Sequence, residues 1–435
     1  MGSLDHIPGT LGLPLIGQTV PFLRDARKMV AERHREYGEV AKGRALGQTA
    51  VTFVSPEATR QIYLDPDRIF SSEIGWSFTI GPLFQRGLML RDFEDHRVHR
   101  LAMAHAFRRA ALQGYVPRIH EITQQHVARM GTGAVDVYAL AKELTLDIAA
   151  QVFVGTTMHE QVATLNRCFV QMMRASISPL RLDLPGLPFR KGMAARRELV
   201  GLFTELVRQR RAEPEGEDLL SRLAHARVED GQPLAVDEVV DHMIFLLLAA
   251  HDTTTATLAV MMWMLARHQT WQDAVVAEIE ALGGDPVTLD NQGELVVTER
   301  VFKEALRMSP PVPFSPRGVL ADTEIDGWAI PAGTMVSTCS LELHRHPAYW
   351  SHANSFDPDR FAPHRAEDKQ HSHLFIPFGG GAHLCLGNHF AELVAKAAMA
   401  GVLTSHRLDD VPGRQVFIQS VPIPKPRGGL VLTVR

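Results

Sequence analysis

Apolar residues recur along most of the chain at the three- and four-residue spacing of helices that bury one face. Polar residues fill the positions between them, as in helices packed around a common core. Pro310-Pro311 and Pro313 end the last central helix, because proline removes a backbone donor and clashes with the preceding turn. The expected helices are 95–110, 117–130, 138–155, 158–176, 194–212, 236–267, 270–282, 296–308 and 386–402.

Short runs of β-prone residues occupy fewer positions than the helical stretches do, and turn residues separate these runs. We expect strands at the C-terminus, within 42–65, and in 317–330 and 334–338. The first forty residues are rich in Pro and Gly and are expected to be irregular, as are 183–191 and 356–384. The pattern therefore predicts a mainly α fold with a minor β component, forming a single domain over 1–435.

The stretch 243–265 is apolar enough to be mistaken for a membrane span. It carries His251, Asp252 and three threonines at its centre, and such residues are rare inside a bilayer without a functional reason. The stretch therefore predicts a buried core helix with a polar functional patch. The N-terminus lacks the basic start and long apolar run of a signal peptide, so we expect a cytoplasmic protein with no membrane anchor.

Composition places the chain among ordinary globular proteins. Of 435 residues, 45% are hydrophobic and 22% are charged, and the formal net charge is −4. No block of Lys and Arg is present, so we expect no nucleic acid partner. The three cysteines are too few for a disulfide framework and indicate a reducing compartment.

The segment from Phe378 to Ala391 has the most specific chemistry in the chain. Three consecutive glycines allow a close backbone approach, and Cys385 follows at the entrance of an amphipathic helix. The amides at a helix N-terminus favour a thiolate, which is the form that ligates a metal. A lone cysteine is otherwise most often a small buried apolar residue. A zinc site is another alternative, with ligands from Cys385, His371, His373, His383 and His389. The spacing of these residues matches no common zinc-binding motif.

Read from Phe378 to Gly387, the residues Phe-Gly-x-Gly-x-His-x-Cys-x-Gly resemble the haem-binding signature of the cytochrome P450 family. The resemblance implies the cytochrome P450 fold, a helical bundle around haem b with a small antiparallel β region. It also implies that Cys385 is the thiolate ligand of the haem iron, an arrangement that favours O–O cleavage. Phe378 and Gly387 are then expected to lie against the cofactor, with Phe378 shielding the sulfur.

Glu304-Ala-Leu-Arg307 places a carboxylate and a guanidinium three residues apart on one helix. By itself such a pair contributes about 0.2–0.5 kcal/mol on a helix surface. The spacing resembles the family's Glu-x-x-Arg motif, and Arg360 matches the arginine that joins it from a later loop. The resemblance implies a structural network that holds the haem-side core together.

A buried haem needs cations for its two propionates. His96 and Arg100 lie four residues apart on one helix face, and their spacing resembles a propionate-binding pair of bacterial family members. Arg317 and His383 match further propionate contacts. Taken singly, each of these residues would more often be a solvated surface group.

One face of the helix expected at 236–267 carries Phe245, Leu248, Ala249, Asp252 and Thr253. Local signals alone also suit Asp252 as the N-cap of a second helix. The residues from Ala249 to Thr254 resemble the family's oxygen-activation motif, (Ala/Gly)-Gly-x-(Asp/Glu)-Thr-(Thr/Ser). The resemblance implies that Asp252 and Thr253 relay protons to dioxygen, and Ala250 replaces the usual glycine.

Together these motifs predict a haem-thiolate monooxygenase that inserts one oxygen atom of dioxygen into an apolar small molecule, most simply by hydroxylation. We expect a monomer that receives electrons from a separate ferredoxin or flavodoxin with its reductase. The N-terminal run at 8–17 resembles that of family members acting on sterols, retinoids and fatty acids, which favours a terpenoid, steroid or fatty-acid-like substrate. A non-oxidative or ligand-sensing haem protein and a zinc hydrolase remain alternatives. The expected pocket residues are Phe245, Leu248, Ala249, Val312, Phe314 and Ile423.

Overall fold

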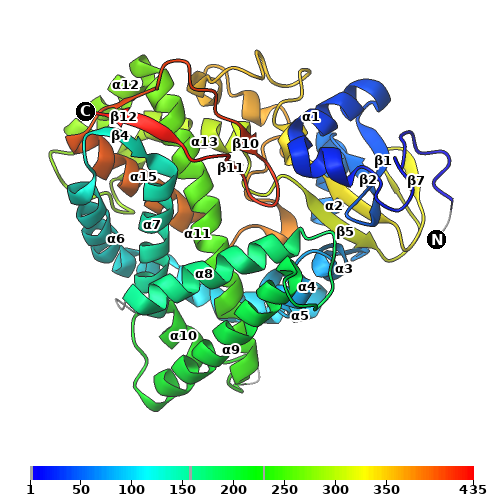
Figure 1. Cartoon of the computed structure of the whole chain (residues 1–435), viewed down its shortest axis with the longest axis horizontal. Helices are drawn as coiled ribbons and strands as arrows, with labels where there is room; N and C mark the ends of the chain where they lie inside the picture. Colours follow the sequence, from blue (N-terminus) through cyan, green and yellow to red (C-terminus); the bar gives the residue numbers. More distant parts are fainter. Residues whose placement is uncertain (1–2, 156–158, 229–230) are drawn as a thin grey trace.

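The computed structural model describes residues 3–155, 159–228 and 231–435 (Figure 1). Helices form the larger part of the molecule, and the predicted mainly α fold with a minor β component is confirmed. The helices in the first half are α1 (Thr19–Tyr37), α2 (Pro56–Leu64), α3 (Ser72–Ser77), α4 (Gly81–Phe84), α5 (Phe93–Ala104), α6 (Arg109–Arg129), α7 (Val137–Ala149), α8 (His159–Ser176) and α9 (Pro188–Ala212). The later helices are α10 (Leu219–His225), α11 (Val236–Arg267), α12 (Gln269–Ala281), α13 (Val296–Met308), α14 (Ser340–Leu343) and α15 (Asn388–Ser405).

The largest sheet has the strand order β1-β2-β8-β5-β3. Strands β2 and β8 are parallel, and the other pairs of this sheet are antiparallel. Its strands are β1 (Val40–Ala45), β2 (Gln48–Phe53), β3 (Phe70–Ser71), β5 (Ser315–Val319) and β8 (Met335–Thr338). The smaller sheets consist of β4 (Gly133–Asp136), β9 (Leu408–Asp409) and β12 (Val431–Val434), of β6 (Thr323–Ile325) and β7 (Trp328–Ile330), and of β10 (Ile418–Gln419) and β11 (Lys425–Pro426).

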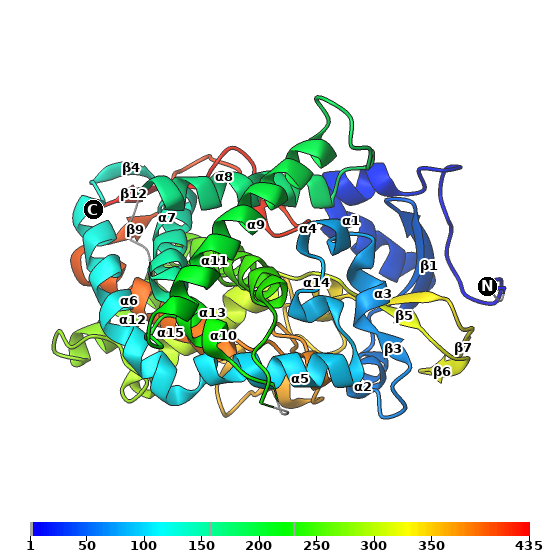
Figure 2. The same cartoon turned by 90° about the horizontal axis from the view of Figure 1, so that it is seen from below.

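Two apolar cores hold these elements. The larger core surrounds α11, which packs against α7, α9, α13 and α15. The smaller core fills the space between the largest sheet and the helices α1 and α2. Figures 1 and 2 show this division, with α1 and the sheet at one end of the molecule and the long helices at the other.

Helix α11 is long and apolar enough to cross a bilayer by composition alone. Within the structure, 72% of its most apolar window is buried against other parts of the chain. A membrane-spanning helix would present that surface to lipid, so α11 is the core helix that its sequence predicts.

The prediction that the first forty residues are irregular is wrong for their second half. Helix α1 covers this part, and it buries Ala26 and Val30 against the neighbouring strands. The stretch 42–65 is likewise not all β-structure, because α2 begins at Pro56. Ser55 caps that helix by accepting a hydrogen bond from the Ala58 amide over 3.0 Å, and proline suits a first helical position.

The loop expected at 183–191 ends earlier than predicted. Pro188 is the first residue of α9, where its missing amide costs no hydrogen bond. The helix predicted at 117–130 in turn begins at Arg109 and contains Pro117. The sequence signals therefore located the long helices from α5 onward, missed α1 and α2, and misplaced several helix ends.

Candidate functional site

A mostly apolar cavity of about 230 Å³ lies where the helical core meets the largest sheet. Helix α13 contributes Phe302 and Leu306 to it, and β5 contributes Ser315 and Arg317. The loop at 376–387 forms another part of the wall. Helix α11 contributes a row of side chains along one face, which is Phe245, Leu246, Ala249, Ala250, Thr253, Thr254 and Thr257.

Cys385 lies in the wall of this cavity with its side chain open to it, whereas Cys168 and Cys339 are buried elsewhere. Its amide donates to the carbonyl oxygen of Phe378 over 2.9 Å and closes the glycine-rich loop. Enclosure by the protein raises the pKa of the Cys385 thiol, while the Gly387 amide and the charge of Arg100 oppose that rise. A positively charged metal in the cavity would shift the balance to the thiolate.

Close packing against the end of α2 explains two glycines of this loop. Gly381 has a φ of +60°, and a Cβ there would lie 1.8 Å from the carbonyl oxygen of Tyr63. A Cβ on Gly380 would lie 2.8 Å from the ring of Tyr63. The glycines thus allow the loop to reach α2, and this contact fixes the position of Cys385.

The four residues predicted to bind propionates all line the cavity. His96 and Arg100 come from α5, Arg317 from β5 and His383 from the cysteine loop. The rings of His96 and His383 stack with centroids 3.9 Å apart. Arg317 is buried and donates to the Pro316 carbonyl oxygen over 2.8 Å and to Ser315 Oγ over 3.2 Å.

Nearby acids balance the charge of this group only in part, because Asp65 and Asp92 act on Arg317 without forming an ion pair with it. Burial, reinforced by Arg100, lowers the pKa of His96 to about 4. Burial, reinforced by His96 and the two arginines, lowers the pKa of His383 to about 2. Within the described part of the chain, neither Arg100 nor Arg317 forms an ion pair, and Nε2 of His96 is buried without a hydrogen-bond partner.

Arg317 is buried and Arg100 is half-buried, and cations in such positions are stabilised by an anionic partner. The two propionates of a haem would supply it, and Cys385 offers a sulfur ligand in the same cavity. The residues present therefore fit a haem group.

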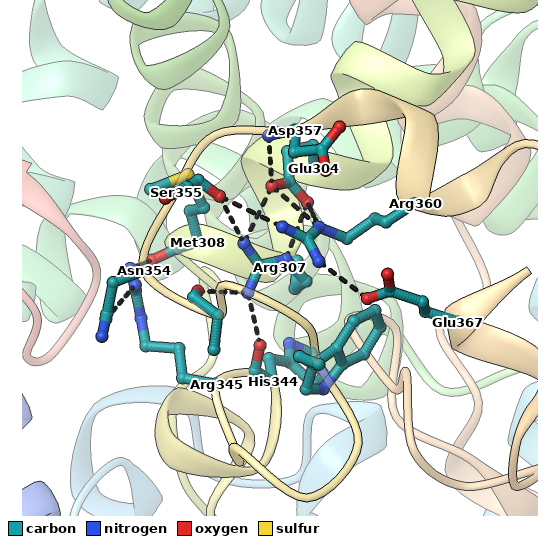
Figure 3. A network of polar contacts seen from close by, with 12 residues as sticks. Glu304, Arg307, Met308, His344, Arg345, Asn354, Ser355, Asp357, Arg360 and Glu367 are labelled. Carbon is teal, nitrogen blue, oxygen red and sulfur yellow. Dashed lines mark hydrogen bonds and ion pairs between the residues drawn. The ribbon is translucent and has the colours of Figure 1, made fainter. Parts of the chain in front are cut away.

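Behind the cavity, Glu304, Arg307 and Arg360 form a fully buried network (Figure 3). Arg307 donates to the Glu304 carboxylate from Nε over 2.7 Å and from Nη2 over 2.8 Å. Arg360 Nε donates to the same carboxylate over 3.1 Å, and Asp357 contributes its amide over 2.9 Å. A second acid, Glu367, accepts from Arg360 Nη1 over 2.7 Å.

This network ties α13 to the later loop without entering the cavity. The remaining N–H groups of Arg307 donate to the carbonyl oxygens of His344, Ala353 and Ser355. From the same helix, Phe302 lines the cavity with its ring centroid 6.3 Å from that of Phe378. The network therefore holds the helix that positions one cavity wall, which agrees with a structural role.

Thr253 lines the cavity, and its hydroxyl donates to the Ala249 carbonyl oxygen over 2.5 Å. Thr254 and Thr257 donate to carbonyl oxygens one turn earlier in the same way. Because the Thr253 proton is engaged within α11, the lone pairs of its oxygen are free to accept from a group in the cavity.

Asp252 does not line the cavity, in contrast to the face predicted for it. One carboxylate oxygen of Asp252 lies 3.2 Å from Nε2 of the buried His251. Burial lowers the pKa of Lys425, and the negative charge of Asp252 acts against that decrease. Lys425 is exposed on β11. The carboxylate therefore lies outside the cavity lining, beside His251 and within electrostatic reach of Lys425. The cavity-facing arc of α11 begins at Phe245 and turns away from Asp252.

Three of the six predicted pocket residues, Phe245, Ala249 and Val312, line the cavity. Leu248 does not, because it is buried in the helical core at the edge of the α11 arc. Phe314 instead lines a second cavity, since the side chains of an extended segment alternate between two faces. Ile423 belongs to the β10–β11 hairpin and lines neither cavity.

Tyr63 and Met89 line the cavity and were not found from the sequence. No local pattern marks them, because each comes from a separate short element. For the zinc alternative, no group of three or more His, Cys, Asp or Glu able to hold a metal ion occurs within 3–155, 159–228 and 231–435.

The comparisons with known proteins agree on one family. The Cytochrome P450 family model matches residues 7–430. A protein of Mycobacterium tuberculosis described as cytochrome P450 136 is 35% identical over 440 residues, which cover 100% of this chain and 89% of the relative. Abscisic acid 8'-hydroxylase 3 of Oryza sativa is 29% identical over 435 residues, or 98% and 85% of the two chains. The solved structure of retinoic acid bound cyanobacterial CYP120A1 has a TM-score of 0.92 and 27% identity, covering 99% of both chains.

Proposed function

The chain belongs to the cytochrome P450 family, and on that premise we propose that this haem-thiolate monooxygenase hydroxylates a terpenoid, steroid or fatty-acid-like molecule. The observation that carries the proposal is the mostly apolar cavity in which Cys385 and Thr253 are both accessible. When bound, haem supplies the activation of dioxygen and the insertion of one oxygen atom into an unactivated C–H bond.

We assign the retention of haem b to residues that already converge on the cavity. Cys385 offers the sulfur ligand, and Phe378 and Gly387 line the cavity on either side of it in the sequence. Arg100 and Arg317, with His96 and His383, offer the positive charge and N–H donors that two propionates need.

The proton-handling groups are Thr253 and Asp252. The Thr253 oxygen accepts a hydrogen bond from a group in the cavity and orients a proton there. Asp252 lies outside the lining and 3.2 Å from Nε2 of His251, and we assign it the exchange of protons between α11 and solvent. A cavity that otherwise excludes water needs both functions, because the reaction consumes protons inside it.

The proposed substrate class rests on the residues that line the cavity and on the proteins to which this chain is similar. Trp76, Phe245 and Leu306 offer apolar contacts, and few charged groups remain once the cofactor's partners are set aside. Two of the similar proteins carry the names of apolar terpenoid acids, abscisic acid and retinoic acid. We therefore place a terpenoid first among the candidates.

We further propose that the enzyme is a cytoplasmic monomer. Its electrons come from a separate ferredoxin or flavodoxin with its reductase.

The first test is the spectrum of the reduced CO complex, in which a thiolate ligand gives a strongly red-shifted Soret band. The second is a screen of terpenoids, steroids and fatty acids for substrate-induced spin shifts, followed by product analysis with redox partners. A ligand that shifts the spin state but yields no oxygenated product would favour the non-oxidative or sensing alternative.

The third test concerns the two proton-handling groups. With one binding substrate, Thr253→Ala should consume NAD(P)H yet release mainly hydrogen peroxide, because an oriented proton acceptor is lost. Asp252→Asn should slow turnover and leave the yield of product per NAD(P)H closer to wild type. Wild-type yield in Thr253→Ala together with wild-type turnover in Asp252→Asn would refute the assignment of both residues.

A further inference from the structure

A buried imidazole, that of His251, lies on α11 directly before Asp252 and takes no part in the cavity lining. Its side chain is 0% exposed, and its ring centroid lies 6.2 Å from that of Phe169 on α8. Neither ring nitrogen has a hydrogen-bond partner in the part of the chain that the structure describes. The imidazole is therefore a buried polar group whose hydrogen-bonding capacity is unused.

The Asp252 carboxylate faces this ring. Its oxygen Oδ1 lies 3.2 Å from Nε2 of His251, and 15% of the Asp252 side chain is exposed. Within 3–155, 159–228 and 231–435, the carboxylate accepts no hydrogen bond and has no other contact at ion-pair distance. Each of the two groups thus has the other as its nearest polar partner.

The direction of the carboxylate depends on this contact. A side chain on a helix has two common orientations about its first bond, and an aspartate without a fixed partner populates both. A nearby imidazole N–H stabilises the orientation that points toward it, because a buried N–H without an acceptor costs free energy. The position of the His251 ring therefore selects the orientation of Asp252.

Neighbouring helices hold His251 itself in place. Its carbonyl oxygen accepts from the Thr255 hydroxyl over 2.8 Å, and that hydroxyl lies 2.6 Å from the hydroxyl of Thr145 on α7. Phe169 on α8 is fully buried beside the ring. A group that is packed from two helices gives a more exact support for a carboxylate than a mobile surface residue would.

The surrounding charges keep the ring neutral. Burial lowers the pKa of His251, and the positive charge of Lys142 on α7 adds to that decrease while Asp252 opposes it. The other titratable groups on which the Asp252 charge acts are Tyr138 of α7 and Lys425 of β11. A neutral imidazole carries one N–H and offers it to a carboxylate without adding a charge to the core.

We propose that His251 is a positioning residue, which holds the Asp252 carboxylate in the orientation from which it exchanges protons. The inference rests on the proposed role of Asp252 and adds a second residue to it. No bond is made or broken at His251, because its ring only donates an N–H. Without the ring the carboxylate turns freely, so a smaller fraction of the enzyme is ready for proton exchange.

The test compares two replacements in the haem-loaded enzyme with one binding substrate. His251→Phe keeps a ring and removes the N–H, whereas His251→Gln keeps an N–H donor. His251→Phe should lower turnover by about fivefold, within the range for residues in contact, and leave the affinity measured by the spin shift unchanged. His251→Gln should recover part of the lost turnover.

A double-mutant cycle with Asp252→Asn separates positioning from general damage. In the Asp252→Asn background, His251→Phe should cause no further loss of turnover, because the group that it positions is already disabled. The solvent deuterium isotope effect on turnover should rise in His251→Phe alone, because proton exchange then limits the rate. An equal loss of turnover in both backgrounds, or an unchanged isotope effect, would overturn the proposal.

His126→Phe is the matched control. His126 is also a buried imidazole beside a carboxylate, with Nε2 2.8 Å from Asp147, but neither residue lines the cavity. This control should lower the melting temperature and leave the turnover of haem-loaded enzyme unchanged. A loss of turnover equal to that of His251→Phe would show that any buried imidazole has this effect, and it would overturn the assignment.

The remaining outcomes separate this inference from the proposed function. Wild-type turnover in His251→Phe with slow turnover in Asp252→Asn refutes the role of His251 alone. Wild-type turnover in Asp252→Asn refutes the role of Asp252, and the inference fails with it. If His251→Phe does not retain haem, His251→Leu supplies the variant without an N–H for the same comparisons.

Discussion

The sharpest test of the fold is the replacement Glu304→Gln, which keeps the shape of the side chain and removes its charge. Glu304 accepts two hydrogen bonds from Arg307, one from Arg360 and one from the Asp357 amide. All three charged side chains are 0% exposed. Arg360 keeps Glu367 as an anionic partner, but Arg307 would be left with neutral oxygen acceptors alone.

The expected cost follows from that geometry. Removing one partner of a buried ion pair typically destabilises a protein by about 3–5 kcal/mol, because the other charge stays buried and unpaired. The entropy of unfolding is about 2.1 cal/mol/K per residue, so a chain of 435 residues changes by roughly 0.9 kcal/mol per degree. The melting temperature of Glu304→Gln should therefore fall by about 3–5 °C.

The control is Glu94→Gln, at an exposed pair with Arg97 that has the same kind of contact at 2.7 Å. Exposed pairs contribute about 0.2–1 kcal/mol, so this change should lower the melting temperature by about one degree or less. Circular dichroism during urea and thermal unfolding measures both variants, with haem loss to apomyoglobin as a second readout. Equal destabilisation in the two variants would refute the reasoning that burial of the network sets its energy.

Four other predictions follow from the site. Cys385→Ser should lose the thiolate-type CO spectrum, and a variant that keeps it would show that another residue is the ligand. The double replacement of Arg100 and Arg317 by Ala should accelerate haem loss to apomyoglobin by tenfold or more, and a tenfold change corresponds to about 1.4 kcal/mol. An unchanged rate of haem loss would show that the two arginines do not belong to the cofactor site. Gly381→Ala should prevent haem incorporation, since its Cβ would overlap a backbone carbonyl oxygen, and normal incorporation would mean that the loop can move. Burial opposes ionisation of Glu367, but hydrogen bonds and the charges of the neighbouring arginines outweigh burial and lower the pKa of Glu367 from 4.5 to about 2. The stability that the ionised Glu367 contributes is therefore present above pH 4.5 and is lost as the pH falls toward 2. Glu367→Gln should flatten the acid side of the curve of unfolding free energy against pH, and an unaltered curve would contradict this.

Several features of this protein were determined by the sequence alone, because they depend on residues close together in the chain. The spacing of apolar residues located α11, and the three glycines before Cys385 marked a close backbone approach at the entrance of a helix. The Glu304 and Arg307 pair could be assigned a structural role from three-residue spacing and family resemblance. Short-range geometry is set by backbone dihedrals, which the local sequence controls.

The ends of helices and strands, and the helices next to Pro-rich segments, were harder to predict from the sequence. Helix α1 lies in a region whose prolines and glycines dominate the local signal, and only packing on the sheet reveals its buried face. Pro188 looked like part of a loop, although the same residue is favoured at the first turn of a helix. A single proline is compatible with both positions, so tertiary packing decides between them.

Only the tertiary structure decided which side chains meet. Helical periodicity placed Asp252 and Thr253 near one face, but the rotation of α11 within the core turned Thr253 to the cavity and left Asp252 outside its lining. Strand alternation required Phe314 and Ser315 to point in opposite directions, yet packing of α1 on the sheet created the second cavity that Phe314 lines. Periodicity fixes the angles between residues of one element, whereas the orientation of that element depends on the contacts of all its neighbours.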